Sequence, residues 1–554
     1  MKDKQTLKWL YTHSKSRLWS IIFLAILRCT LTVLGVTFAL TSRHVIDAAV
    51  ARDFDGFIHS AAKLALIMLA QIGIRLLGQS IEAHIGARLN NSLRGNVFSR
   101  LLKKEYSHVS SYHTGDLMTR LNNDISVISK GILSLIPSVL ALVVGLVYAL
   151  YSLTRLDRGF AFIFLFGGLL LLLTISAFRG FLKNTHKRVQ ETESRVRSFL
   201  QESLGSLLMI KVFVIEDKIA KRGDKLQEEN YRAQMKRRNL TLVSSSGLSI
   251  IFSAGSLYAL VWSAYRLFLG TITFGTLTAI LQLVNQIQTP FAGLSGVVPQ
   301  YYSILASAER IIELDRLPEE KDIYRTLNPK DDYQTLNQLC FENISFGYGR
   351  DIVLQNASLT IDKGDFAVIS GISGIGKSTL IKLLLGVFTP QEGDIFLDMT
   401  DEKIPAGKHS RPLFSYVPQG NLLLSGTIRE AISLVSPNSS DDEIMKAAEI
   451  ACAADFIKAL PLGLDTVLGE KGTGLSEGQI QRLAVSRAIL TDAPIILLDE
   501  ATSALDEETE AKLLRNIKNL KSKTCIIISH KRAAFDICNK HIYIENKKIR
   551  TETV

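Results

Sequence analysis

The sequence predicts two halves of different fold class: an all-α half embedded in a membrane, followed by an α/β half with a mainly parallel sheet. Uncharged stretches of membrane length lie within the first 310 residues, whereas short β-rich runs alternate with helical stretches after about Leu317. Hydrophobic residues make up 47% of the 554 residues, and the mean hydropathy is +0.19. That hydropathy is high for a soluble protein of this size, so part of the chain is expected to lie in lipid.

The first half is predicted to cross the membrane six times. A helix needs about 20 apolar residues to cross the hydrocarbon core of a bilayer. The first segment of this length contains Arg28, and the second contains Lys63 and Arg75. The expected spans lie at about 18–40, 57–81, 131–154, 159–178, 242–265 and 272–297.

Basic residues predict the orientation of these spans. The segment up to Arg17 holds five Lys and Arg residues, and the connections at 82–130 and 179–238 hold seven and fifteen, whereas the opposite side has four. Because Lys and Arg favour the cytoplasmic side, both termini and the two long connections are expected in the cytoplasm, with the spans in the plasma membrane. The net charge of +11 therefore faces anionic lipid rather than nucleic acid. Residues 1–17 suit an interfacial helix, with a solvated tail as the alternative.

The strongest motif of the second half is a glycine-rich loop between a predicted strand, 366–370, and a predicted helix that begins near Leu380. It reads Gly-Ile-Ser-Gly-Ile-Gly-Lys-Ser-Thr, a complete P-loop in its expected context. Its backbone N–H groups are expected to surround phosphate oxygens, while Lys377 reaches the β and γ phosphates and the Ser378 hydroxyl binds Mg²⁺. The residues expected to bind ATP here are Gly371, Ser373, Gly374, Gly376, Lys377, Ser378 and Thr379.

Polar residues end two further predicted strands. Asp499 and Glu500 follow the strand at 495–498. Asp499 is expected to hold Mg²⁺ and Glu500 to polarise the attacking water as general base, with a structural ion pair as the alternative for Glu500. His530 follows the strand at 524–529, where its imidazole is placed to contact the γ phosphate. The alternative for His530 is an ordinary histidine at a strand end.

The segment Leu-Ser-Glu-Gly-Gln at 475–479 lies some twenty residues before Asp499. Together with the P-loop, it resembles the signature of the ATP-binding cassette family. The resemblance implies that the signature caps the ATP held by the P-loop of a partner, so that two cassettes are obligatory. Glu477 departs from the family, which has glycine there, and puts a carboxylate near the expected phosphate. The implied ATP-binding residues of the signature are Ser476, Gly478 and Gln479.

The same resemblance assigns roles outside these motifs. Tyr348 is similar to the aromatic residue that stacks on adenine, and Gln419 to the glutamine that senses magnesium and the membrane domain. Taken singly, each would be a core or surface residue. Asp506 lies in a loop similar to the one that communicates across the cassette dimer. The implied catalytic residues are Glu500, His530 and Gln419, and the implied magnesium ligands are Ser378, Gln419 and Asp499.

The membrane half resembles that of an exporter of this family. Gly115 and Asp116 lie in a segment similar to the first intracellular loop, whose short helix docks on the cassette and couples it to the membrane domain. Residues 206–217 would hold the second such helix. The implied boundaries are 18–317 for the transmembrane domain, 318–334 for a linker, and 335–554 for a cassette with a β subdomain and a helical subdomain.

A chain with six spans and one cassette looks like half of a transporter. The resemblance implies a dimer that uses ATP and Mg²⁺ to export an amphipathic small molecule, lipid or peptide. A homodimer is favoured, and a paralogous partner is the alternative because Glu477 could mark a chain that relies on another signature. An importer on the exporter fold, with a siderophore-like substrate, and an ATP-gated channel or regulator remain alternatives for the function.

A polar stripe on the sixth span predicts the substrate path. Its residues recur at spacings of three and four, so they share one helical face. Polar side chains that face lipid cost free energy, so the stripe and Arg28 are expected to face the bundle interior. Hydrogen bonds that only hold the helices together are the alternative. The candidate cavity residues are Arg28, Gln282, Asn285 and Gln286, and Thr278 and Thr289 complete the stripe.

Overall fold

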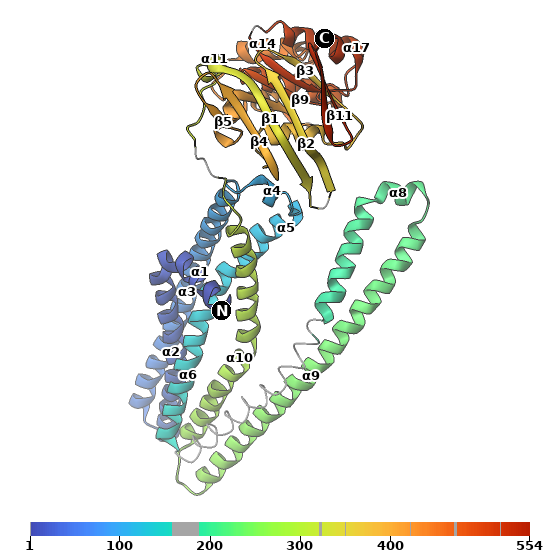
Figure 1. Ribbon diagram of the computed structural model, residues 1–554. Coiled ribbons are helices and arrows are strands. Elements are labelled where there is room, and N and C mark those ends of the chain that lie inside the picture. Colours follow the sequence, from blue (N-terminus) through green and yellow to red (C-terminus); the bar gives the residue numbers. More distant parts are fainter. Residues whose placement is uncertain are drawn as a thin grey trace. The chain divides into compact units, whose positions relative to one another are not determined.

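The computed structural model describes residues 2–157, 185, 188–320, 324–349, 351–420, 423–469, 474–520 and 522–553. These residues belong to two compact units (Figure 1). The helical unit comprises residues 1–101 and 114–316, and the cassette unit comprises residues 102–113 and 317–554. A short segment from within the first half, 102–113, therefore belongs to the same compact unit as the second half.

Long helices dominate the helical unit. Among the described residues, four stretches are long and apolar enough to cross a membrane: Lys4–Val50, Phe54–Leu101, Thr114–Leu156 and Ser249–Phe268. The predicted span at 272–297 lies on the helix α10, and the predicted span at 159–178 lies outside the described residues. The helices are α1 (Lys2–Ser14), α2 (Leu18–Val50), α3 (Phe54–Leu101), α5 (Thr114–Thr119), α6 (Ile125–Leu156), α8 (Leu207–Val212), α9 (Glu216–Phe268) and α10 (Phe274–Asp315), with a 3-10 turn at Lys15–Arg17 and a π-helical turn at Arg120–Asp124.

Glycines let the helices of this unit approach one another closely. A Cβ at Gly145 of α6 would lie 2.3 Å from Thr32 Cγ2 of α2, and a Cβ at Gly131 would lie 2.3 Å from Ile304 Cδ1 of α10. Small residues allow such packing where lipid provides no hydrophobic drive for helix association. Two apolar clusters join these helices. The first apolar cluster includes Leu24, Leu89, Ile128, Leu133 and Ile311, and the second includes Val36, Ala149, Leu153, Leu283 and Ile287.

The cassette unit contains two main sheets in its described part. The larger has the strand order β12-β11-β3-β10-β9-β6, parallel except for the antiparallel edge strand β12. The smaller is antiparallel in the order β2-β1-β4-β5. The strands are β1 (Leu336–Tyr348), β2 (Asp351–Asp362), β3 (Phe366–Ser370), β4 (Glu392–Met399), β5 (Lys403–Pro405), β6 (Phe414–Val417), β9 (Ile495–Asp499), β10 (Thr524–Ile528), β11 (Lys540–Glu545) and β12 (Lys548–Thr553), and a short pair β7 (Gly426–Thr427) and β8 (Val467–Leu468).

Helices surround these sheets and hold several of the motifs. The helix α12 begins with the last residues of the P-loop, α16 begins within the signature, and α17 begins directly after Asp506. The helices of this unit are α4 (Tyr106–Val109), α11 (Asp332–Thr335), α12 (Lys377–Leu384), α13 (Ile428–Ser433), α14 (Asp441–Ile450), α15 (Ala454–Ala459), α16 (Glu477–Leu490), α17 (Glu507–Lys518) and α18 (Arg532–Ile537), with 3-10 turns at Lys408–Leu413 and Gly463–Asp465.

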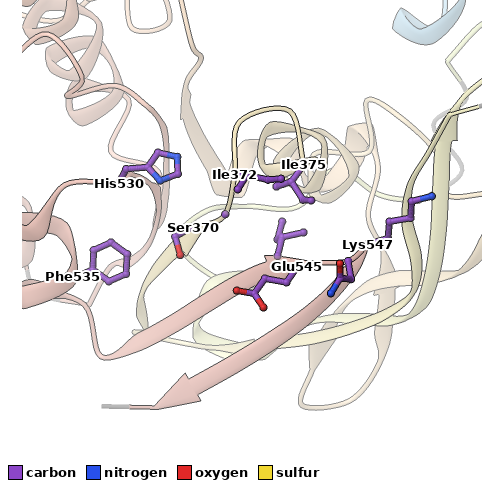
Figure 2. A pocket seen from close by; sticks show the side chains of 10 residues that line it. Ser370, Ile372, Ile375, His530, Phe535, Glu545 and Lys547 are labelled. Carbon is purple, nitrogen blue, oxygen red and sulfur yellow. The ribbon is translucent and has the colours of Figure 1, made fainter.

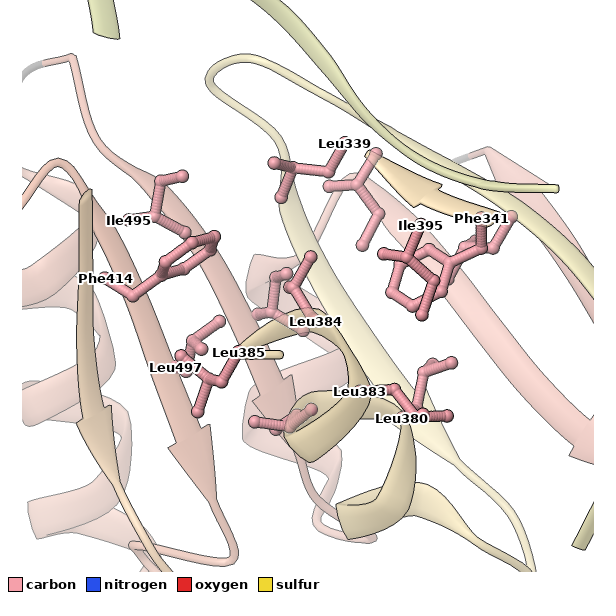
Figure 3. Close-up of a cluster of buried hydrophobic side chains, with 14 of the residues drawn as sticks. Leu339, Phe341, Leu380, Leu383, Leu384, Leu385, Ile395, Phe414, Ile495 and Leu497 are labelled. Carbon is pink, nitrogen blue, oxygen red and sulfur yellow. The ribbon is translucent and has the colours of Figure 1, made fainter. Parts of the chain in front are cut away.

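The central strands are apolar throughout because both faces of the larger sheet are covered. In β9, Ile495 and Leu497 belong to one apolar core, whereas Ile496 and Leu498 belong to another. Successive side chains of a strand point to opposite faces, and parallel sheets are usually covered on both. Figure 3 shows the first of these cores, where Leu497 packs near α12 and Phe341 lies farther toward the smaller sheet. This burial fixes the strand ends at which the motif residues lie.

Replacing Phe341 with Ala should lower the free energy of unfolding of the cassette by about 3–5 kcal/mol, because the ring is buried in this core. Ile352 on the neighbouring strand is exposed, so Ile352→Ala should change it by less than about 0.5 kcal/mol. Denaturant unfolding of the full chain in detergent measures both variants. Equal destabilisation by the two substitutions would contradict the assigned core.

Candidate nucleotide-binding site

The P-loop joins a buried strand to a helix through a backbone conformation that requires glycine. Every residue of β3 is buried, and α12 begins directly at Lys377. Gly376 has a φ of 114°, and a Cβ there would lie 2.3 Å from Val353 Cγ1. Any other residue would therefore be strained and would clash with β2. This conformation lets the loop and the first turn of α12 turn their N–H groups toward one centre.

Lys377 lies at that centre and is 5% exposed. Its Nζ donates to Gly371 O at 2.8 Å and to Ile372 O at 3.2 Å, and it lies 2.9 Å from His530 Nε2. None of these groups carries a negative charge. A buried ammonium without an anionic partner attracts an anion strongly, because burial removes the water that would otherwise stabilise it. The geometry thus brings Lys377 and His530 together at a site suited to phosphate.

A cavity of about 770 Å³ lies beside the P-loop (Figure 2). Ile372 and Ile375 of the loop line it, with His530 and Phe535 on one side and Lys547 on the other. The turn between β11 and β12 completes the lining. His530 is thus reachable from solvent while it contacts Lys377.

Asp499 is placed to bind a cation beside the P-loop. It is 1% exposed at the end of β9, and it accepts hydrogen bonds from Ser378 Oγ at 2.9 Å and from Tyr416 OH at 3.1 Å. Burial raises the pKa of the Asp499 carboxyl above its usual range, although the two hydrogen bonds oppose this shift. A bound cation would lower this pKa again, because it favours the ionised carboxylate. The hydroxyl and carboxylate oxygens are ligands of the kind that Mg²⁺ takes, along with phosphate oxygens and water.

Glu500 follows Asp499 in a conformation that turns its side chain out of the strand. Its φ is +50°, in the left-handed region, and its N–H donates to Ile528 O at 3.1 Å. Gln419 Nε2 donates to Glu500 Oε2 at 2.7 Å. Gln419 therefore contacts the carboxylate expected to act as general base, rather than Asp499. The partner of Glu500 is this neutral amide, so the geometry favours a chemical role over an ion pair.

Tyr348 ends β1 with its ring 44% exposed, as a residue that stacks on a base must be. Its OH lies 3.2 Å from Thr379 Oγ1 in α12, and its ring makes an edge contact with Phe388 at 5.5 Å between centroids. Phe388 in turn makes an edge contact with Tyr106 of α4 at 6.0 Å. The sequence interpretation missed both Phe388 and Tyr106. No local pattern marks them, since each has a role only through these contacts.

The segment 102–113 joins the cassette unit through its backbone as well. Glu105 N–H donates to Pro318 O, and Glu320 N–H donates to Lys103 O, both at 3.0 Å. The sequence assigned coupling to Gly115 and Asp116, which lie in α5 of the helical unit, where Asp116 pairs with Arg120. The residues of 102–113 that contact the rest of the cassette unit therefore come before Gly115 and Asp116 in the sequence.

The signature forms the N-terminus of α16. Ser476 Oγ accepts from Gln479 N–H at 3.3 Å, and Gln479 Oε1 accepts from Ser476 N–H at 2.9 Å, which makes a reciprocal cap. A Cβ at Gly478 would lie 2.9 Å from Ala504 O, so only glycine allows the helix to pack on that loop. Glu477 is exposed in the first turn, where the helix dipole stabilises a carboxylate. The positive end of α16 is therefore partly neutralised by the chain itself.

The loop that contains Asp506 is held from two sides. Asp506 caps α17 by accepting from Thr509 N–H, and these hydrogen bonds hold the pKa of its carboxyl below the usual range. Lys531 Nζ donates to Thr502 O at 2.9 Å and to Leu505 O at 2.7 Å. Lys531 was also missed, although its position directly after His530 is visible in the sequence. It ties the strand end that carries His530 to this loop.

The candidate cavity residues do not all share one environment. Gln282 Oε1 accepts from Ser42 Oγ at 3.3 Å, and the Gln286 amide lies against Gly35 of α2. Asn285 is exposed. Arg28 pairs with Glu82 of α3 at 2.8 Å. Part of the stripe thus forms hydrogen bonds between helices, which was the alternative reading of it.

The fold and the site define a helical membrane domain fused to a P-loop ATPase cassette. Two family models match: "ABC transporter transmembrane region" at residues 18–291 and "ABC transporter" at residues 354–503, which together cover about three quarters of the chain. The chain belongs to the ABC transporter family, and its exporter-type fold class is confirmed. It is an ATP-binding membrane protein whose ATPase activity drives transport.

Relatives that match most of the chain are named as a flippase and as multidrug export proteins. The chain is 29% identical to an ATP-dependent lipid A-core flippase of Syntrophus aciditrophicus, over 84% of this chain and 78% of the relative. It is 27% identical to a candidate multidrug export ATP-binding/permease protein of Staphylococcus aureus, over 88% and 84%. The fold is similar to that of a bacterial Atm1-family ABC exporter with ATP bound, with a TM-score of 0.81, 23% identity, and coverage of 98% of this chain and 95% of that one.

Replacing Lys377 with Ala should weaken ATP binding at least tenfold. A hydrogen bond to a charged group contributes about 1.5–3 kcal/mol, and about 1.4 kcal/mol is a factor of ten in affinity. Titration with a fluorescent ATP analogue measures the change. Lys446→Ala, at an exposed position of α14, is the control and should leave the affinity within twofold. Unchanged affinity in the Lys377 variant would contradict the phosphate site.

Replacing Tyr106 with Ala should uncouple transport from hydrolysis, because it removes an aromatic contact that contributes about 0.5–1.5 kcal/mol. The expected result is an approximately threefold fall in the flux of a fluorescent amphipathic dye per ATP hydrolysed in inside-out vesicles. ATP affinity should not change. Tyr106→Phe keeps the ring and should restore the ratio, and His108→Ala, in the same helix, should leave it unchanged. If Tyr106→Ala alters ATP affinity but not the flux per ATP hydrolysed, the Tyr106–Phe388 contact supports only the nucleotide site, which contradicts the coupling role.

Proposed function

We propose that two copies of this chain form an exporter that moves an amphipathic molecule out across the plasma membrane, with the cassettes in the cytoplasm. One observation carries the proposal: a single chain contains Lys377 at the P-loop, Asp499 bonded to Ser378, and Glu500 bonded to Gln419, the residues to which we assign ATP hydrolysis. A chain with a complete set needs no catalytic group from another protein. The Lys and Arg bias of the connections supports the cytoplasmic orientation.

Exposed surfaces of the chain support a partner of the same kind. The segment around α8 exposes a run of large apolar side chains, among them Leu204, Leu208, Val212, Phe213 and Val214, each at least two thirds exposed. Exposed apolar clusters of this kind mark interaction sites. The capped N-terminus of α16 is also exposed at Ser476. A second copy would cover α8 and would receive this signature at its own P-loop, so we favour the homodimer over a paralogous pair.

The chemistry assigned to the site follows from its contacts. Ser378 and Asp499 would hold Mg²⁺, which when bound would neutralise charge on the phosphates. Lys377 would exchange its carbonyl acceptors for phosphate oxygens, and His530 beside it would contact the γ phosphate. Glu500 would accept a proton from the attacking water, with Gln419 fixing the position of its carboxylate. Tyr348 would stack on adenine.

The names of the relatives support an amphipathic substrate. One relative is named for flipping lipid A-core and another for multidrug export. Lipids and most membrane-active drugs combine an apolar body with a polar group. We propose the same broad class for this chain, whose helical unit exposes Asn285 beside buried apolar residues of α10.

Replacing Glu500 with Gln should lower steady-state ATP hydrolysis by at least about 100-fold, because a general base contributes about 10² to 10⁴ in rate. ATP binding should persist, and the variant should accumulate as an ATP-bound dimer. Hydrolysis is measured by phosphate release, and mass by size-exclusion chromatography with light scattering.

Glu508→Gln, at an exposed position of α17, is the control and should hydrolyse ATP as the wild type does. Appreciable turnover by the Glu500 variant would refute its role as general base. A chain that stays monomeric and inactive when expressed alone would count against the homodimer.

A further inference from the structure

An ion pair lies inside the helical unit, where charges are costly. Arg28 Nη2 donates to Glu82 Oε2 at 2.8 Å, from α2 to α3. Arg28 Nη1 also donates to Ser138 Oγ and to Ser134 O of α6, and Gln300 Nε2 of α10 donates to Ser134 Oγ at 2.6 Å. Four helices thus meet at one group of polar side chains, which we name the polar layer.

The polar layer separates the two apolar clusters of the bundle. Leu24, one turn before Arg28 on α2, belongs to the first apolar cluster, and Val36, two turns after it, belongs to the second. Arg28 is ten residues into α2, about 15 Å along the helix axis, whereas Glu82 directly follows the predicted span at 57–81 and Ser134 lies in the first turn of the predicted span at 131–154. Helical side chains lean toward the N-terminus, so the guanidinium reaches from Arg28 toward the cytoplasmic ends of the predicted spans, where Glu82 lies.

The pair is not sealed. The Arg28 side chain is 30% exposed and that of Glu82 is 33% exposed. Among the described residues, Arg28 Nε and Glu82 Oε1 have no hydrogen-bond partner. Packing alone does not require such a pair, because apolar residues of similar volume stabilise a buried position as well or better. An arginine within a predicted membrane span, such as Arg28, is instead expected to mark a functional site.

We propose that Arg28 and Glu82 bind the head group of an amphiphile that carries both a phosphate and an ammonium group. An anionic head group on Arg28 would leave Glu82 unpaired beside a like charge, and a cationic head group on Glu82 would leave Arg28 unpaired. In a zwitterionic head group, the phosphate replaces Glu82 as the partner of Arg28, and the ammonium replaces Arg28 as the partner of Glu82, so each charge keeps a partner. The guanidinium fork binds phosphate oxygens in pairs, and Glu82 receives the ammonium.

The proposal rests on the proposed function, because it identifies the substrate class of the exporter. The apolar tail of the ligand would lie along the helices beside the exposed edge of the polar layer. The Ser134 and Ser138 hydroxyls and the Gln300 amide supply further hydrogen bonds at the same depth. The polar layer therefore discriminates between head groups by charge, while the apolar tail fixes the position of the ligand along the helices.

The test compares three lipids that share the same fluorescently labelled tail: phosphoethanolamine, phosphoglycerol and trimethylammonium head groups. Fluorescence anisotropy measures their binding to the full chain in a non-ionic sugar detergent. The wild type should bind the phosphoethanolamine lipid at least tenfold more tightly than the other two. Arg28→Gln and Glu82→Gln should each remove this preference. Glycerophosphoethanolamine, which has no tail, should compete far more weakly.

The double variant Arg28→Gln/Glu82→Gln keeps an amide contact between the helices without charge. It should retain the wild-type melting temperature within a few degrees and still lack the preference. Arg43→Gln is the matched control, because the Arg43–Asp47 pair on α2 has similar exposure, 32% and 25%, and it should keep the preference. Equal binding of all three lipids by the wild type, or a preference that survives in the double variant, would overturn the head-group site.

ATP hydrolysis by the same wild-type preparation separates this result from the proposed function. Hydrolysis without a lipid preference contradicts the head-group site alone. A preparation that binds the lipid selectively but hydrolyses no ATP contradicts the exporter and leaves the head-group site supported. If glycerophosphoethanolamine competes as strongly as the phosphoethanolamine lipid, the ligand is a soluble zwitterion, and the proposal of an amphiphile is contradicted.

Discussion

The cassette depends on a buried cation that has no carboxylate partner among the described residues. Lys377 donates to carbonyl groups and contacts a histidine, and none of these carries negative charge. In a region of low dielectric, such a cation is stabilised mainly by an anion that enters from outside. The P-loop glycines and the buried strand β3 fix the position of Lys377. Asp499 and Ser378, bonded to each other, are the residues that would bind a cation close by. Magnesium and a nucleotide together would satisfy both halves of this site.

The helical unit meets the same constraint in the opposite way, because the buried charges among its described residues are paired internally. Asp124 is buried and accepts from Arg310 Nε at 2.7 Å and from Ser307 Oγ at 2.9 Å. The Arg28–Glu82 pair differs from this one because both members are partly exposed. A buried ion pair is a structural contact, whereas a ligand can replace one partner of an ion pair that is partly exposed. The proposed ligand site of the cassette unit thus has a cation without an anionic partner, whereas that of the helical unit has an ion pair that a ligand could exchange.

Local motifs allowed much of the cassette to be predicted from sequence. The strand, P-loop and helix around Lys377 are contiguous, so their pattern appears in a single stretch of residues. Tyr106 and Phe388 could not be found in this way, because they are far apart in the chain and meet only in the folded cassette unit. Helical periodicity grouped Gln282 with Asn285 on one face, but it could not show that Ser42 bonds the first while the second is exposed. A period identifies a face of a helix, and tertiary packing decides what that face contacts.

The contacts of Tyr348 suggest how occupancy of the nucleotide site reaches the rest of the chain. A base stacked on its exposed ring would restrict that ring, and the edge contact with Phe388 would restrict Phe388 in turn. Phe388 contacts Tyr106, whose segment continues directly into α3 before it and α5 after it. Separating two rings in edge contact loses dispersion and quadrupole attraction of about 0.5–1.5 kcal/mol, so a shift of one ring favours a shift of the next. Since the peptide chain joins this segment to two long helices, a change in the position of Tyr106 must be absorbed at the ends of α3 and α5.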